Sequence, residues 1–161
     1  MKKYLLIVLF YLYCNQLQAQ SISLLNLINL ANLNNTQIGS TLTSNKVWAM
    51  QYGEELDGFV VEHYQTTAQP VKKETIIGGV GFKTATGSVL HTVSYVSPNV
   101  QYVINLVAET KKAGLNMFFQ GSDARDNIYI YESFLYHVVI RLAINNSKGV
   151  IDITQKHALV Q

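Results

Sequence analysis

Residues 97–115, SPNVQYVINLVAETKKAGL, decide the fold. Ser97 is a favoured N-cap residue, and Pro98 suits the first helical position, where its missing N–H group leaves no hydrogen bond unmade. Apolar side chains then recur at the spacing of one helical face: Val100, Val103, Ile104 and Val107. Gly114 favours a left-handed stop. The stretch therefore predicts a helix that begins near Ser97, ends near Gly114 and buries Val103, Ile104 and Val107.

Eight further stretches are typical of β-strands, four before this helix and four after it. They are residues 46–53, 58–65, 74–83, 89–96, 115–120, 128–132, 134–144 and 150–155. The last two strands of each set are joined by short turns rich in small and polar residues. A leucine-rich helical stripe precedes the first set, and residues 36–45 are either a second short helix or a loop.

The order helix-plus-four-strands thus occurs twice, in residues 22–96 and 97–155. We interpret these two segments as pseudo-repeats from an old duplication of one architecture. Four strands with one apolar face need a helix to cover that face. The sequence therefore predicts the α+β class: an antiparallel sheet with its helices packed on one face.

The first twenty residues have the pattern of a signal peptide. Lys2 and Lys3 form a basic start, residues 4–13 are an apolar run, and Ala19 offers a cleavage site. Ten apolar residues are too few to span a bilayer, so no stable membrane anchor is expected after cleavage. We expect an exported protein, periplasmic or secreted, cut near Ala19 or Gln20, with residues 21–161 forming a single domain.

Cleavage at this site would change the charge and the cysteine content. The whole chain has 12 basic and 10 acidic residues. Without Lys2 and Lys3 the count is 10 against 10, so the net charge is zero, and a neutral chain lacks the basic surface that nucleic acid requires. The only cysteine, Cys14, would also leave, so we expect no disulfide and no nucleic-acid partner.

Catalytic and metal-binding patterns are weak. No two histidines have metal-ligand spacing, so no metal and no cofactor are expected. The glycine run at residues 78–81 lacks the lysine of a phosphate loop. Ser88 and Ser133 lack the context of a nucleophile. Glu62 and Glu132 would form an acid–base pair only if their strands were neighbours. No catalytic residue is assigned.

A binding surface is the better-supported hypothesis. In residues 134–144 the alternate side chains from Tyr136 to Ile144 are all apolar and should face the helices, which turns His137 and Arg141 outward. The same alternation places Phe118, Tyr129 and Tyr131 on the outer face. Aromatic side chains beside an arginine are typical interface anchors. The predicted binding face comprises Phe118, Tyr129, Tyr131, His137 and Arg141, joined by Tyr64.

The plan from residue 22 to residue 155 resembles the β-lactamase inhibitor protein family. The resemblance implies an eight-stranded antiparallel sheet that carries helices on one face and binds a target protein with the other. The two disulfides of that family have no counterpart in this sequence. The chain also resembles small exported bacterial proteins that combine such a helix with such strands. Neither resemblance transfers an activity.

Three functions follow as hypotheses. The first is an exported, non-enzymatic module that binds a protein or a small ligand on the open face of the sheet. The alternatives are a small periplasmic hydrolase or other enzyme with an unrecognised site, and a structural component of the cell envelope. An enzyme should show a deep pocket with convergent polar groups, whereas a binding module should show a shallow face with exposed aromatic residues.

Overall fold

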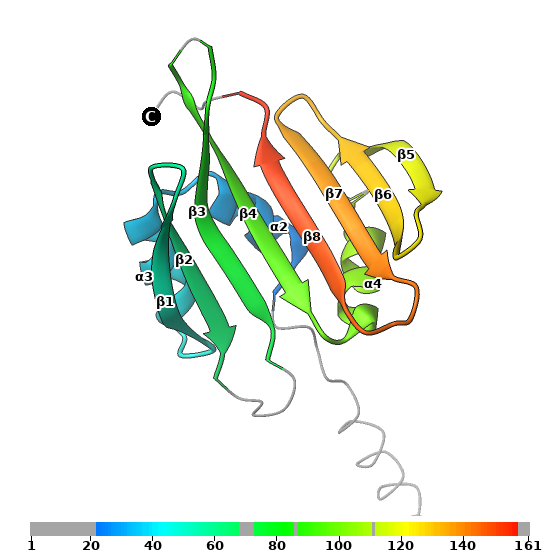
Figure 1. Ribbon diagram of the computed structural model, residues 1–161, viewed down its shortest axis with the longest axis horizontal. Coiled ribbons are helices and arrows are strands. Elements are labelled where there is room, and N and C mark those ends of the chain that lie inside the picture. Colours follow the sequence, from blue (N-terminus) through cyan, green and yellow to red (C-terminus); the bar gives the residue numbers. More distant parts are fainter. Residues whose placement is uncertain (1–21, 68–72, 86, 111, 158–161) are drawn as a thin grey trace, which may run out of the picture.

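The computed structural model describes residues 22–157 except 68–72, 86 and 111 (Figure 1). The described helices are α2 (Leu24–Ala31), α3 (Asn35–Thr43) and α4 (Val100–Glu109). The strands are β1 (Trp48–Leu56), β2 (Phe59–Thr66), β3 (Thr75–Lys83), β4 (Val89–Ser97), β5 (Asn116–Ser122), β6 (Asp126–Glu132), β7 (Tyr136–Ala143) and β8 (Gly149–Gln155). All eight predicted strands are confirmed, within a few residues at their ends. The predicted signal peptide and its cleavage site lie outside the described residues.

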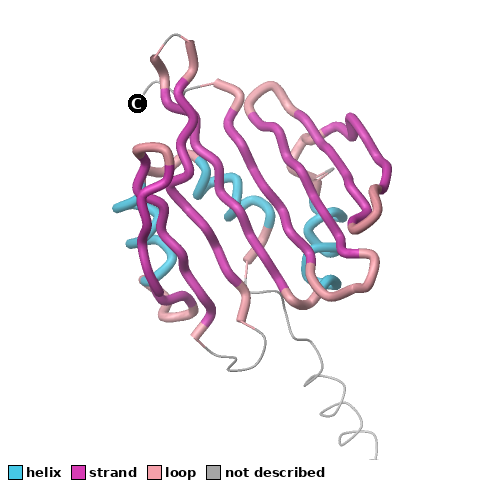
Figure 2. The backbone as a smooth tube through the Cα atoms, in the orientation of Figure 1, coloured by secondary structure: helices cyan, strands magenta, loops and turns pink. Residues whose placement is uncertain are grey.

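The strands form one antiparallel sheet in the order β1-β2-β3-β4-β8-β7-β6-β5 (Figures 1 and 2). Each set of four consecutive strands is a meander, and the two sets join where β4 pairs with β8. The predicted α+β class is confirmed. Two described helices precede β1–β4 and one precedes β5–β8, so the duplication stays a prediction.

The described helices all lie on one face of the sheet, behind the strands in Figure 2. Helix α3 contacts β1, β2 and β3, whereas α2 and α4 contact the central strands β4, β8 and β7. Leu27 of α2 and Val103 and Leu106 of α4 are fully buried against Ile140 and Ile151 of the sheet. The opposite face carries no helix of the described part of the chain.

Helix α4 begins later than the sequence predicts. Ser97 ends β4, and Asn99 is the N-cap, its side chain accepting a hydrogen bond from the backbone N–H of Gln101 at 3.1 Å. The helix also ends earlier than predicted, at Glu109 with Thr110 as its C-cap. Gly114, with a φ of +70°, lies in the turn that follows.

The predicted apolar stripe of α4 is partly wrong. Val103 is fully buried and Val107 packs against the core, but Ile104 is 40% exposed. The buried face consists instead of Val100, Tyr102, Val103 and Leu106. The helix is therefore rotated so that the Tyr102–Leu106 line, rather than Ile104, meets the sheet.

The undecided segment 36–45 is helical in α3. Asn34 caps α3 by accepting the N–H of Gln37 at 3.0 Å, and the Gln37 side chain accepts the N–H of Asn34 at 3.1 Å. Gly39 lies inside this helix, where any larger residue would clash: a Cβ there would stand 2.9 Å from the Tyr64 hydroxyl. The close approach brings α3 down onto β2.

Candidate binding surface on the open face of the sheet

Two of the predicted site residues lie where they were expected. His137 and Arg141 alternate along β7 with Val138 and Ile140, which are completely buried under the helices. Consecutive side chains of a strand point to opposite faces, so His137 and Arg141 project from the helix-free face. We call this the open face of the sheet.

The predicted face of Tyr129 and Tyr131 is wrong. Tyr131 is 4% exposed and lies opposite Val138, while Tyr129 lies opposite Ile140 and packs against the core. Directly paired residues of antiparallel strands share a face. Both tyrosines therefore belong to the helix-covered side, and the isoleucines that alternate with them, Ile128 and Ile130, belong to the open face.

Tyr64 is also on the helix-covered side, contrary to expectation. It is 1% exposed and lies opposite Ile76, a core residue. Its hydroxyl donates a hydrogen bond of 2.5 Å to the Glu62 carboxylate. Burial, followed by this bond to Glu62, raises the pKa of Tyr64. The side chain is a structural element of the core and is not available on the open face.

Phe118 is exposed, but at the edge of the sheet. It is 72% exposed and forms a β-bulge in β5, between Met117, which pairs with Tyr131, and Phe119, which pairs with Ile130. Because of the bulge, Phe119 lies on the open face, beside Ile130. The ring of Phe119 covers Gly121, where a Cβ would stand 2.6 Å from it.

One row of side chains crosses the open face over all eight strands. The pairing register aligns Tyr52, His63, Ile77, Ser94, Asp152, Val139, Ile130 and Phe119. The neighbouring row includes Val150, Arg141 and Ile128. On the β5–β8 half these rows form a continuous surface of partly exposed side chains, which we call the open-face patch: Phe119, Ile128, Ile130, Val139, Arg141 and Val150.

Arg141 is held in position within the open-face patch. Its Nη2 donates a charge-assisted hydrogen bond to Asp152 Oδ2 on β8, and Ser94 on β4 donates to Asp152 Oδ1 at 2.6 Å. Arg141 remains 43% exposed, while Asp152 is 20% exposed. The guanidinium group is thus fixed over the centre of the sheet and still meets solvent.

A second charged group lies at the end of β6 and β7. The Glu132 carboxylate contacts His137 Nδ1 and Lys156 Nζ, each at 3.0 Å. The hydrogen bond from Lys156, and then that from His137, lower the pKa of Glu132. At the far end of the row, Tyr52 stacks on His63 with ring centroids 4.2 Å apart, and Glu54 accepts from that histidine at 2.9 Å.

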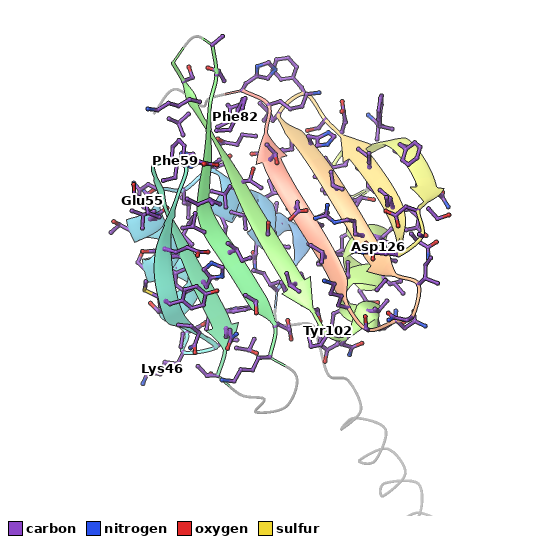
Figure 3. The ribbon with its side chains drawn as sticks, in the orientation of Figure 1. Lys46, Glu55, Phe59, Phe82, Tyr102 and Asp126 are labelled. Atoms are coloured by element: carbon purple, nitrogen blue, oxygen red, sulfur yellow. The ribbon has the colours of Figure 1, made fainter. Side chains whose placement is uncertain are left out.

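An enzyme would need a deep pocket into which several polar side chains converge. A groove of about 480 Å³ lies at one end of β6 and β7, near Asp126 in Figure 3, and includes Arg125, Ala143 and Lys148 in its lining. Two other hollows, of about 210 and 410 Å³, lie beside the helices. No group of three or more potential metal ligands occurs in the described residues.

The remaining catalytic candidates do not assemble. Glu62 on β2 and Glu132 on β6 belong to strands separated by four others, and Glu62 bonds Tyr64 on the helix-covered side. They cannot act as an acid–base pair. Ser133 Oγ accepts the backbone N–H groups of Leu135 and Tyr136 at 3.2 and 3.1 Å, which stabilises the β6–β7 turn. Ser88 lies beside the β3–β4 turn, where its carbonyl accepts from Thr84.

Two polar clusters on the helix-covered side have no signal in the sequence. Asn32, the C-cap of α2, donates to the Tyr136 hydroxyl at 2.7 Å and accepts from Gln155 Nε2 at 3.0 Å. Tyr95 donates to the buried Glu74 carboxylate at 2.6 Å. Burial, and then the bond to Glu74, raise the pKa of Tyr95. These contacts join residues 21 to 123 positions apart, so no local spacing could indicate them.

Comparison with models of known protein families found no match, and neither did searches of curated proteins and of solved structures. The resemblance in plan to the β-lactamase inhibitor proteins therefore stays a prediction. No helix of the described residues is both long and apolar enough to cross a membrane.

Proposed function

We propose that the protein is exported and binds a protein partner through the open-face patch, without catalysing a reaction. One observation carries the proposal. The described helices cover one face of the sheet, while the other face presents five partly exposed apolar side chains around Arg141, which Asp152 holds in place. Burying apolar side chains around a positioned arginine is typical of the energetic centre of an interface.

The shape of the surface favours a folded protein over a small ligand. Small-molecule sites enclose most of their ligand in a concave cavity. The open-face patch is instead built from adjacent strands of one sheet, with Ile128 and Ile130 next to Val139 and Arg141. The expected partner has an apolar contact surface with a carboxylate or carbonyl group that faces Arg141.

Site-specific crosslinking tests this proposal. A photoreactive residue is placed at Ile130, within the open-face patch, and at Gln101 as a matched control on the exposed side of α4. Each purified variant is irradiated with the exported protein fraction of its own source. A discrete adduct from Ile130 alone, reduced at least tenfold by Arg141→Glu, supports the proposal. Equal adducts from both positions, or no protein adduct from Ile130, would overturn it.

The mass of the native protein tests export directly. The basic start, the ten-residue apolar run and Ala19 support cleavage near residue 20. Intact-mass analysis of the native protein should show a chain that begins at Gln20 or Ser21, without added lipid. Recovery of the uncleaved chain from the cytoplasm contradicts this part of the proposal.

A further inference from the structure

The strand β5 is an exposed edge without any charged residue. It ends the sheet, so among the described residues no strand pairs with its outer side. Its sequence, NMFFQGS, contains neither a charge nor a proline. Met117, Phe118 and Phe119 are 52%, 72% and 46% exposed. Proteins usually protect such edges with charges, prolines or a covering segment, because an open apolar edge is a template for another strand.

The opposite edge strand, β1, has the protection that β5 lacks. Both strands contain one bulge, at Gln51 in β1 and at Phe118 in β5. Only β1 also carries adjacent carboxylates, Glu54 and Glu55, both exposed. A second copy that paired along β1 would place two carboxylates from each copy along the new strand pair, and charged side chains on an edge strand oppose such pairing.

We propose that β5 is a self-association edge: two copies of the chain pair β5 with β5 in antiparallel orientation about a twofold axis perpendicular to the sheet. A second copy is the occupant that the charges favour. When β5 pairs with itself, no charge faces another charge. The formal net charge is +2 for the whole chain and zero after the expected removal of Lys2 and Lys3, so repulsion between copies is small. A twofold axis needs one self-complementary surface, which an antiparallel strand pair provides.

The area indicates a weak dimer. Given about 200 Å² for a fully exposed large side chain, the three exposed residues Met117, Phe118 and Phe119 offer about 340 Å² of apolar surface per copy. The total with backbone contacts stays below the roughly 1,200 Å² of a standard stable interface, so a concentration-dependent dimer is expected. This pairing keeps both open faces on the same side and joins the two eight-stranded sheets into one.

Sedimentation velocity of the protein between about 10 µM and 1 mM tests the proposal. The wild type should shift from monomer towards dimer over this range. Phe118→Lys, which adds a charge at the β5 bulge, should weaken dimerisation at least tenfold. Gln51→Lys adds the same charge at the β1 bulge and should leave the dimer unchanged. Phe118 is mostly exposed, so neither variant should alter the thermal midpoint appreciably.

Three results would overturn the proposal: a wild type that is monomeric throughout, a dimer lost equally in both variants, and a dimer that survives Phe118→Lys. Its failure is distinguishable from failure of the proposed function. Phe118 is outside the open-face patch, so Phe118→Lys should still form the Ile130 crosslinked adduct. Conversely, Arg141→Glu should still dimerise.

Discussion

At the scale of single residues, His91 makes the stability of the fold depend on pH. Its Nδ1 is buried without a hydrogen-bond partner, the one such side-chain atom in the described residues. Its backbone N–H donates to Gln155 at 3.1 Å, which holds it beside the Asn32–Tyr136 cluster. Burial lowers the pKa of His91, and no charged neighbour contributes to that shift.

The pH dependence follows from this shift. The unfolded chain binds a proton at His91 near pH 6.5, whereas the folded chain binds it only at lower pH. The stabilising contribution of neutral His91 is therefore complete above pH 6.5 and is lost as the pH falls towards the folded-state pKa. Urea melts between pH 5 and 7.5 should show less loss of stability with falling pH in His91→Gln than in the wild type. Identical slopes would contradict this prediction.

Tyr131 and Ile104 exchange the roles that sequence analysis predicts for them. Tyr131→Ala should lower the free energy of unfolding by about 3–5 kcal/mol, because it empties a buried aromatic site opposite Val138. Ile104→Ala should lower it by less than about 1 kcal/mol, because this side chain is 40% exposed. Denaturant melts of both variants measure the difference. Equal losses would show that Tyr131 does not contribute to the core.

The error at Tyr131 has a physical origin. In Ile-Tyr-Ile-Tyr both alternating sets are apolar enough to be buried, so hydrophobicity cannot choose between the two faces of β6. The register with β7 decides it, since Glu132 pairs with His137 and so Tyr131 must oppose Val138. His137 and Arg141 were predictable because only one of the two sets along β7 is continuously apolar.

At the scale of elements, Gly149 sets the contact between α4 and the sheet. A Cβ at Gly149, the first residue of β8, would stand 2.6 Å from a methyl group of Val103. Gly149→Ala should therefore force α4 away from β8 and lower stability by about 1–3 kcal/mol. In Gly53→Ala the new Cβ would meet only ordinary contacts at 3.5 Å or more, so its effect should be much smaller. Thermal melts of the pair measure this, and equal effects would contradict it.

The existence of the elements was more predictable than their ends. Alternation and turn residues indicated all eight strands, because those signals are local. The start of α4 was misplaced because Ser97 and Asn99 are both favoured N-cap residues. In the structure Ser97 is the last residue of β4, and Asn99 caps the helix. The bulge at Phe118 shifts the alternation of β5 by one residue, which no pattern in NMFF indicates.

At the scale of the whole molecule, contacts between the two halves predict one cooperative domain. Leu24 of α2 donates its N–H to Glu109 of α4 at 2.8 Å, and Asn32 bonds both Tyr136 and Gln155. The fluorescence of Trp48, the only tryptophan and a core residue, should therefore change with denaturant in parallel with circular dichroism. Residues 97–161 alone should show no cooperative transition. A cooperative melt of that fragment would contradict a single domain.

The β4–β8 junction pairs strands that are far apart in the sequence. Within each meander the paired strands are neighbours in sequence, but Ser94 and Asp152 at the junction are 58 residues apart. Loop closure over that distance is slow, and folding rates fall as such contacts increase. The inner edge of β4 stays unpaired until β8 pairs with it. We therefore expect the centre of the finished sheet to form last, and a chain that stops before Gly149 to carry an open, aggregation-prone edge in place of that centre.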